Sequence, residues 1–501
     1  MKTTAYLLPL LFLVLAVSLA SCDPDTEFRT GESVDLRFST DTLTFDTVFT
    51  ARGSATRMFK VYNDGAEPIM IDRISVDGTT GVEYTFNVDG FQGPEAEDVV
   101  IWGEDSIFVF VEVEVDPTEP TEVSPFVAED LLVFETGNRE QNVVLTAFGQ
   151  NAEYLFDFAR GQAFLFSCDN GTVTLPNDLP VVIYGSLVID SCILQVMAGT
   201  EIYFHGGVQR NQALVGGNGF FNDGFIFTQP DGSVQFLGTR ENPIILRTDR
   251  LEEEFAEEPA KYRGLILGAG SRNNILEHTV MTNAIVGITI DSAAEVTIDN
   301  SIIAYSGGPA ISAYESDVTV TNSVFHSNFG NAVQFVKGGS LTMRYVTIAN
   351  YGVDASSLVL TNFDCDENGQ NCVAAPMTAN LDNCIISGSR PSELIFFDIF
   401  AGDEPGLFEI NIDNSVVRTD NAFLQTQDGL FADFYGGICN GCVNLAFDDP
   451  LFRDLNEDDY TLDSLSVARG IGFPIPGVGE DILGVARDGM MPDAGAYEGG
   501  E

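Results

Sequence analysis

The sequence predicts an all-β chain with two parts: an N-terminal β-sandwich, then a parallel β-solenoid that ends in a C-terminal capping segment. An octapeptide recurs in the second half, as V-T-I-D-N-S-I-I at 296–303 and V-T-V-T-N-S-V-F at 318–325. A repeat of about 22 residues that alternates apolar and polar side chains is typical of stacked β coils. Shorter strand-like runs separated by turn residues fill 33–150.

The chain begins with the features of a secretory signal peptide, which we assign to residues 1–21. Lys2 precedes an apolar core at Leu7–Leu15, and this run is too short to span a bilayer comfortably. The core is followed by Leu19-Ala20-Ser21-Cys22, which resembles the lipobox of bacterial lipoproteins. The resemblance implies cleavage before Cys22 and lipid attachment to it. The alternative is an ordinary secretion signal with an unrelated cysteine.

Residues 22–32 form a predicted acidic tether after the lipidated cysteine. Asp23, Asp25 and Glu27 follow that cysteine closely. An acidic patch at this place resembles the display signal of Bacteroidetes-type surface lipoproteins, which implies a lipid-anchored location on the bacterial outer membrane, facing outward. The alternative is that these residues only reflect the acidity of the whole chain.

The chain as a whole is strongly acidic, with 23 Lys and Arg against 75 Asp and Glu and a formal net charge of −52. Such a chain repels phosphate backbones, so we predict that it does not bind nucleic acid. We expect these carboxylates either to bind divalent cations or, in the alternative, to form only a solvated surface. Because 45% of the residues are hydrophobic, the chain can bury large cores and is not a disordered acidic protein.

Residues 33–150 are predicted to form an immunoglobulin-like β-sandwich. Short strand-like runs alternate with turn signals, which is the pattern of two packed antiparallel sheets. The region resembles the β-sandwich modules of bacterial surface lipoproteins, and it has no cysteine, which excludes an immunoglobulin disulfide. The predicted strands are 43–49, 58–62, 69–74, 107–115, 130–134 and 142–148.

The fifth position of the octapeptide predicts a corner between two strands. Asparagine occupies it in four copies, and asparagine tolerates the left-handed backbone conformation that a sharp corner requires. Copies stacked about 4.8 Å apart would place these side chains in one column, where their amides hydrogen-bond to one another. The predicted structural ladder consists of Asn300, Asn322, Asn383 and Asn414, while His278 and Tyr345 hold the same position in weaker copies.

Residues 151–437 are assigned to the solenoid and 438–501 to its cap, which we expect to cover the open C-terminal end. The repeats, together with Y-R-G-L-I-L at 262–267 and P-D-A-G-A-Y-E at 492–498, resemble right-handed parallel β-helix proteins. The sequence departs from the pattern of these proteins at Leu465–Arg469. The resemblance indicates the fold but almost nothing about a reaction or a ligand. Projecting segments are predicted at 252–259, 352–377 and 390–407.

Seven cysteines remain after Cys22, and outside the cytoplasm they are free to pair. Cys384 takes the place that serine holds in other copies, so we interpret it as a small buried residue without a partner. The connectivity of the others stays open at this point. The candidate disulfides are Cys168 with Cys192, Cys365 with Cys372, and Cys439 with Cys442.

The segment D-C-D-E-N-G at 364–369 has the order of oxygen ligands that opens a calcium loop. Asp364, Asp366 and Asn368 would bind the ion, while the glycine permits the sharp turn. The acid expected at the twelfth position is missing, since Ala375 stands there. Calcium is therefore the one cofactor that the sequence suggests, and the alternative is a polar turn closed by a disulfide.

No catalytic motif can be assigned, so the catalytic residues stay unknown. The G-H-G and R-x-K motifs of polygalacturonases are missing, and His205 in F-H-G-G is the nearest approach. Lys337 and Arg344 lie near neighbouring coils, yet nothing marks either as the base of a lyase. With three histidines in the chain, no histidine-rich metal cluster is expected.

Two functions therefore compete. The first is a lipid-anchored envelope protein that binds a polysaccharide or an envelope protein on a flank of the solenoid, without catalysis. The second is a surface polysaccharide-degrading enzyme, a lyase or a glycoside hydrolase, on the same scaffold. The missing motifs favour the first function, although the scaffold permits the second.

Overall fold

The computed structural model divides into two compact units, Met1–Asn151 and Ala152–Glu501. The signal peptide, Cys22 and most of the acidic tether lie outside the described residues. Within the described part, no helix is long and apolar enough to cross a membrane. The structure describes residues 28–31, 34–49, 56–78, 82–115, 126–150, 152–155, 164–183, 185–206, 208–210, 220–222, 224–366, 368–400, 406–420 and 434–499.

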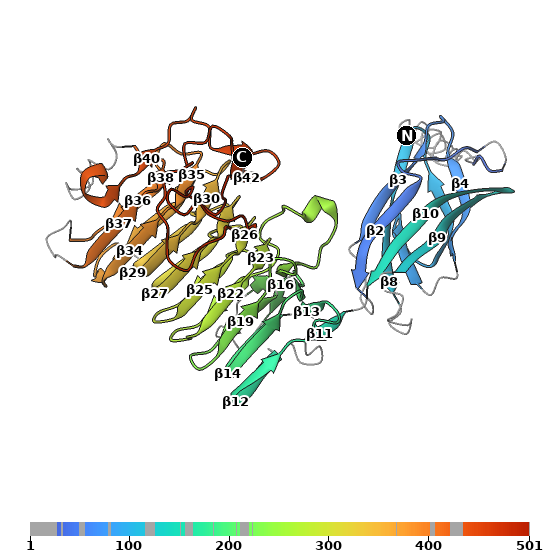
Figure 1. The fold of residues 1–501 in the computed structure, drawn as a ribbon. Helices are drawn as coiled ribbons and strands as arrows, with labels where there is room; N and C mark the ends of the chain where they lie inside the picture. The colour runs from blue at the N-terminus through green and yellow to red at the C-terminus, as the bar shows by residue number, and fades with distance from the viewer. Residues whose placement is uncertain are drawn as a thin grey trace, which may run out of the picture. The chain divides into compact units, whose positions relative to one another are not determined.

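The first unit consists of two five-stranded β-sheets that share one hydrophobic core (Figure 1). Phe59 of one sheet and Phe134 of the other meet edge to face in this core, with ring centroids 6.2 Å apart. The six predicted strands are present, and the immunoglobulin-like topology stays a prediction. One sheet has the order β1 (Arg37–Phe38), β3 (Arg57–Asn63), β8 (Asp105–Val115), β5 (Val82–Val88), β6 (Phe91–Gly93). The other has the order β2 (Thr42–Phe49), β10 (Arg139–Gln150), β9 (Phe126–Thr136), β4 (Ile69–Asp77), β7 (Glu95–Ile101).

The second unit is a parallel β-helix with three faces, which we call the first face, the polar face and the covered face in chain order. Each strand pairs in parallel with the equivalent strand of the next coil. The covered face comprises β11 (Glu153–Leu155), β13 (Val181–Ile183), β15 (Glu201–Phe204), β20 (Ile244–Thr248), β23 (Thr279–Thr282), β26 (Ile302–Ala304), β28 (Val324–His326), β30 (Thr347–Asn350), β35 (Ile385–Gly388), β38 (Val416–Val417) and β40 (Val443–Asn444).

The first and polar faces belong to one fifteen-stranded sheet, because four long strands turn the corner between them. These long strands are β12 (Phe164–Thr174), β14 (Ser186–Met197), β27 (Ile311–Thr321) and β29 (Val333–Arg344). The first face also contains β18 (Phe225–Thr228), β21 (Gly264–Leu267), β24 (Ile288–Ile290), β31 (Leu358–Thr361) and β36 (Leu394–Phe397). The polar face also contains β19 (Ser233–Leu237), β22 (Asn274–Glu277), β25 (Glu295–Asp299), β34 (Met377–Asp382), β37 (Phe408–Asp413) and β39 (Cys439–Asn440).

The long strands also close a ring of pairings. Because β14 and β27 each pair along both faces, eight parallel strands follow one another in a circle. The ring is β24-β21-β18-β14-β19-β22-β25-β27.

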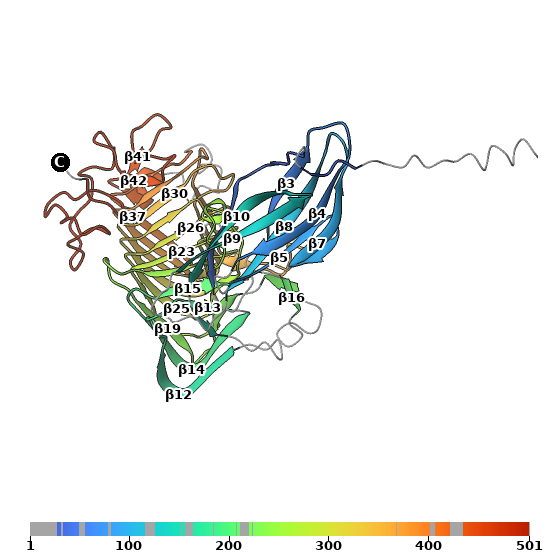
Figure 2. The same cartoon turned by 90° about the vertical axis from the view of Figure 1, so that its right-hand side faces the viewer.

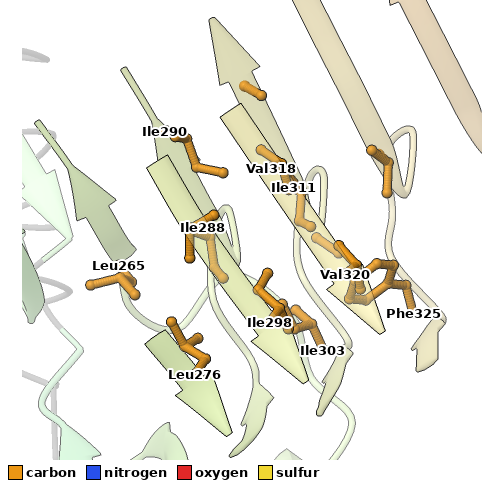
Figure 3. Packing of buried hydrophobic residues seen from close by; sticks show 14 of the residues in the cluster. Leu265, Leu276, Ile288, Ile290, Ile298, Ile303, Ile311, Val318, Val320 and Phe325 are labelled. Atoms are coloured by element: carbon orange, nitrogen blue, oxygen red, sulfur yellow. The ribbon is translucent and has the colours of Figure 1, made fainter. Parts of the chain in front are cut away.

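The interior of the coils is filled by columns of aliphatic side chains (Figure 3). Alternate residues of each strand point inward, and in-register pairing sets Leu276, Ile298 and Val320 on successive rungs. All three are buried. Burial of this kind contributes roughly 25 cal/mol per Å² of apolar surface, and no single coil can provide it alone.

The projecting segments are shorter than predicted. The predicted loops 352–377 and 390–407 each contain a first-face strand, β31 and β36, whose apolar L-V-L and L-I-F cores complete a coil. What projects from the first loop is the hairpin of β32 (Phe363–Asp364) and β33 (Val373–Ala374). Outside the coils also lie β16 (Val208–Arg210) paired with β17 (Phe220–Asn222), and the one-turn helix η2 (Glu253–Phe255) within the predicted acidic insertion.

The C-terminal segment does not cover the open end, contrary to our expectation. The coils continue beyond 437 through β39 and β40, and the core at that end contains Phe434 of η3 (Phe434–Ile438). Residues 445–499, which we call the C-terminal segment, instead pack against the outer side of the covered face (Figure 1). Figure 2 shows its hairpin, β41 (Phe452–Asp454) and β42 (Asp459–Leu462), outside the stack of strands. Under the C-terminal segment the covered face presents the apolar side chains of Ile302, Val324, Ala349, Ile385 and Val416, which need this cover.

Candidate functional site

The corner asparagines stand in one column. Each follows the last residue of a polar-face strand, and the in-register pairing of these strands puts them on one edge of the helix. All have the left-handed backbone conformation that the corner requires. The φ angles are 50° for Asn300, 48° for Asn322, 55° for Asn383 and 46° for Asn414.

The amides of the corner do not bond to one another, so the predicted ladder is wrong for three of the four residues. Asn322 Nδ2 donates to the Glu480 carbonyl (2.9 Å), and Asn383 Nδ2 donates to the Phe473 carbonyl (2.8 Å). Asn414 Nδ2 likewise donates to the carbonyl of Ile471 (2.6 Å). The side chains point outward at this corner, where the C-terminal segment offers backbone carbonyls that would otherwise lack partners.

The buried hydrogen-bonded ladder is formed one residue later. Ser301 Oγ accepts the Thr279 N–H (3.0 Å), and Ser323 Oγ accepts the Ser301 N–H (3.1 Å). The N–H of Cys384 is accepted by Ser415 Oγ (2.9 Å). Cys384 is buried and free, as predicted, and burial raises the pKa of its thiol to about 12. In the sequence, the recurrence of serine directly after the corner residue indicates this ladder.

Outward side chains of the polar face lie in columns open to solvent. The middle column is uncharged and consists mostly of hydroxyl and amide groups, and none of its members is buried. Asn411 Nδ2 donates to Asn380 Oδ1 on the neighbouring rung (3.1 Å). We define the middle column as Gln195, Gln235, Ile275, Thr297, Thr319, Thr342, Asn380 and Asn411.

A second column, next to the corner, carries charge. We call it the edge column, and it contains two pairs of carboxylates on neighbouring rungs, which lie about 4.8 Å apart. Burial and the charge of Glu277 raise the pKa of Asp299, and burial and the charge of Asp413 raise the pKa of Asp382. The edge column consists of Glu277, Asp299, Thr321, Arg344, Asp382 and Asp413. Its members hold the fourth position of the octapeptide, and six of the eight members of the middle column hold the second, so the repeat already contained this signal.

One end of the edge column opens into a pocket of about 380 Å³, which we call the corner pocket. Asp299 Oδ1 is buried there, and among the described residues it has no hydrogen-bond partner. Burial and the charge of Arg240 lower the pKa of His278, while Arg240 Nη2 also binds Glu480 Oε2 (2.9 Å). The pocket is lined by Gly238, Thr239, Arg240, Glu241, Glu277, His278, Asp299 and Asn300.

The basic groups considered from the sequence are not gathered in one cleft. His205 Nδ1 lies 2.7 Å from Asp249 Oδ2, at the covered face. Lys337 Nζ binds Glu315 Oε2 (2.9 Å), and this ion pair raises the pKa of Lys337. Arg344 belongs to the edge column. The structure therefore gives no support to a lyase base at Lys337.

The candidate calcium loop is closed by its own hydrogen bonds. Asp366 Oδ1 accepts the N–H groups of Asn368 (3.0 Å) and Gln370 (2.8 Å), and Asp366 Oδ2 accepts Asn371 Nδ2 (2.7 Å). These bonds lower the pKa of Asp366. Asp364 Oδ2 instead accepts the hydroxyl of Tyr314 (3.3 Å). Among the described residues, no group of three His, Cys, Asp or Glu is arranged to hold a metal. The contacts favour the polar turn, and calcium binding stays a prediction.

All three candidate disulfides are present. Cys168–Cys192 links the first two coils, where β12 pairs with β14. Cys365–Cys372 closes the loop of the hairpin β32–β33, and Cys439–Cys442 closes the turn between β39 and β40. Each bridge lies at an end of the helix or on a projecting loop, where neighbouring coils provide the least packing.

Comparison with known proteins defines the class of the repeat region. Residues 263–404 match the model of a family described as a right handed beta helix region. This match covers the central coils, and it agrees with the parallel pairing described above. No curated protein sequence matches the chain.

Solved structures resemble the chain only weakly. A family 123 glycoside hydrolase from Clostridium perfringens has 4% identity and a TM-score of 0.17, with 23% of this chain and 26% of that chain covered. The E. coli chaperone DraB has 11% identity and a TM-score of 0.15, with 23% and 55% covered. The catalytic unit of a GH87 alpha-1,3-glucanase from Streptomyces thermodiastaticus has 11% identity and a TM-score of 0.28, with 72% and 73% covered. These scores are too low for a functional inference.

Proposed function

We propose that the protein is a lipid-anchored envelope protein that faces outward from the bacterial outer membrane and binds a polysaccharide along the polar face of its β-helix, without catalysis. The observation that carries the proposal is the middle column. Its hydroxyl and amide groups can both donate and accept hydrogen bonds, as sugar hydroxyls require. The covered face, by contrast, is packed under the C-terminal segment from β26 to β40.

The length of the middle column suits a repeating ligand. Eight rungs at about 4.8 Å give a row of about 34 Å. An extended glycan would meet equivalent groups at regular intervals along such a row, so many weak contacts would add up. An envelope protein is the other partner that a flat, polar surface of this kind fits.

The anchoring part of the proposal rests on the residues around Cys22. The lipobox-like Leu19-Ala20-Ser21-Cys22 directly follows the apolar core of the signal. Several acyl chains on one residue give firm membrane attachment, whereas a single chain would be marginal. Loss of membrane attachment in a Cys22→Ser variant, measured by fractionation, is the expected result.

Binding can be tested on the soluble fragment 23–501 with a panel of neutral and acidic polysaccharides, by calorimetry. Thr319→Val and Thr342→Val remove hydroxyls from the middle column at nearly constant volume. Each is expected to weaken binding by about threefold to tenfold, the effect of one hydrogen bond. Thr289→Val, the same substitution on the first face, is the matched control. Equal affinities of all three variants would place the ligand elsewhere.

The corner pocket favours a second function, hydrolysis of a surface polysaccharide. In retaining glycoside hydrolases the two catalytic carboxyl groups lie about 5–5.5 Å apart, close to the spacing of neighbouring rungs. Asp299, whose pKa is raised by burial, would be the acid, and Glu277 beside it the nucleophile.

This second function is tested by incubating the fragment 23–501 with the same panel and measuring reducing and unsaturated products. Asp299→Asn and Glu277→Gln should each lower product formation at least a hundredfold, within the range of general acid–base catalysis. Asp317→Asn, on an exposed part of the polar face, should leave it unchanged. Absence of products from every polysaccharide would leave binding as the function.

A further inference from the structure

The first unit has one end that carries its N-terminal entry, which we call the entry end. Arg29 bridges to Ile69 at the start of β4, and Ile69 pairs with Ile101 at the end of β7. Trp102 follows directly, so Phe28 and Trp102 belong to the same end of the two sheets.

The chain leaves the first unit at the opposite end. β10 begins at Arg139, close to the entry end, because the neighbouring Gly137 approaches Gly31 and donates its N–H to Asp72. β10 then runs for 12 residues to Gln150, which is about 40 Å at 3.4 Å per residue. The sheets therefore separate the point of entry from the point of exit by almost their full height.

The tether to the lipid is short. Phe28 follows Cys22 by only six positions, and a fully extended chain of six residues spans at most about 21 Å. If Cys22 carries lipid, as the proposed function requires, the entry end must lie within that distance of the membrane surface. The end of β10 at Gln150 then lies on the side of the first unit that is away from the membrane.

Two exposed aromatic side chains mark the entry end. Trp102 is 57% exposed and Phe28 is 38% exposed. The loop that carries Trp102 is held in place by two hydrogen bonds. The Trp102 backbone carbonyl accepts one from Asn63 Nδ2 (3.1 Å) and one from the Asp105 N–H (3.3 Å). The next residue, Gly103, lies so close to the Ala66 carbonyl that a Cβ there would clash. Among the described residues of this unit, the large apolar ring of Trp102 stays more than half exposed to water although its loop is fixed.

We infer that the entry end rests on the lipid surface, with Trp102 and Phe28 at the level of the headgroups. Tryptophan prefers this level because its ring is apolar while its N–H can hydrogen-bond. The nearby carboxylates of Glu67 and Glu104 would be repelled by anionic lipid, so a zwitterionic surface is the expected partner. The inference rests on the proposed lipid anchor and adds an orientation to it.

The chain contains a single tryptophan, so intrinsic fluorescence reports on Trp102 alone. The full lipidated protein would be reconstituted into phosphatidylethanolamine–phosphatidylcholine vesicles and isolated by flotation. Contact with the lipid should shift the Trp102 emission to shorter wavelength relative to the soluble fragment 23–501. Lipids brominated near the headgroup should quench at least half of the emission.

The matched control moves the single tryptophan to the middle of β8. In the double variant Trp102→Phe, Phe110→Trp, the new ring sits on an exposed sheet face away from the entry end, and brominated lipid should leave its emission unchanged. Flotation with unquenched Trp102 would overturn the orientation while leaving the anchor intact. Failure to float would overturn the anchor and the orientation together.

Discussion

Small buried hydroxyl groups join successive coils where the polar face meets the covered face. Ser323 Oγ accepts the N–H of Ser301 and donates to the Thr321 carbonyl (2.7 Å). A backbone N–H at this depth has no water to replace a lost acceptor, and a buried unpaired group costs about 1–3 kcal/mol. These side chains therefore stabilise the stack although each is only one hydroxyl.

Ser323→Ala is accordingly expected to lower the free energy of unfolding by about 1–3 kcal/mol, measured by denaturant titration. Cys384→Ser is the control at the equivalent rung, where a hydroxyl can replace the thiol. It should stay within about 1 kcal/mol of the wild type. Equal destabilisation by the two substitutions would show that volume, and not hydrogen bonding, decides stability here.

A buried histidine lies at the contact between the covered face and the C-terminal segment. His326 packs against the rings of Tyr305 and Tyr460, and its Nδ1 lies 3.9 Å from Asp458 Oδ1. Tyr460 donates its hydroxyl to the same carboxylate (2.7 Å). Burial lowers the pKa of His326 to about 4, although the charge of Asp458 acts in the opposite direction.

Because this pKa is lower in the folded state than the ordinary value of about 6.5, the unfolded chain binds the extra proton between pH 6.5 and 4. The contribution of His326 to stability is therefore complete above pH 6.5 and is lost as the pH falls toward 4. We expect His326→Gln to flatten the decline in this window by up to about 3 kcal/mol. Thermal unfolding of both proteins across the window measures this, and parallel curves would contradict it.

At the scale of elements, the corner asparagines link the coils to the C-terminal segment. Asn383 does so twice, because Oδ1 accepts the Phe473 N–H (3.0 Å) while Nδ2 donates to the Phe473 carbonyl. Asn383→Ala should remove both bonds, speed amide exchange around residue 473 about tenfold or more, and cost about 1–3 kcal/mol. Asn411→Ala, an exposed asparagine of the polar face, should leave that exchange unchanged. Unchanged exchange in both variants would show that apolar packing alone holds the segment.

The hairpin β32–β33 is the element where calcium would act. Since the Asp366 carboxylate already accepts three hydrogen bonds from its own turn, we expect calcium to leave the Tm unchanged. Asp366→Ala should lower the Tm by a few degrees with or without the ion. A rise in the Tm of the wild type on adding calcium, abolished by Asp366→Ala, would establish an ion site instead.

The repeat made the coils predictable, but not what lies against them. Period-two patterning and the left-handed asparagine are local properties, so they indicated the polar-face strands and the corner. The partners of the Asn322 and Asn383 amides come from 158 and 90 residues away, in a segment without periodicity. First-face strands such as β31 were missed because three apolar residues inside a polar stretch resemble a loop. The corner pocket depends on neighbouring rungs, which the octapeptide shows only once its copies are stacked.

At the scale of the whole molecule, the C-terminal segment is the last part of the chain that buries apolar side chains. It buries Ile385 and Val416 on the covered face, together with its own Leu451, Leu462 and Ala494. A chain that ends at Asn444 keeps every coil but exposes this row. We expect it to bind a hydrophobic dye more strongly and to self-associate in gel filtration. A monomer with unchanged dye binding would show that the coils need no cover.

Because synthesis proceeds from the N-terminus, the coils are complete before the residues that shield their apolar flank are made. For a time every molecule exposes an apolar stripe of the kind that chaperones bind. Only a finished chain hides the stripe, so a prematurely terminated product stays recognisable to proteases and chaperones. The last tenth of the polypeptide thereby distinguishes a complete chain from a prematurely terminated one.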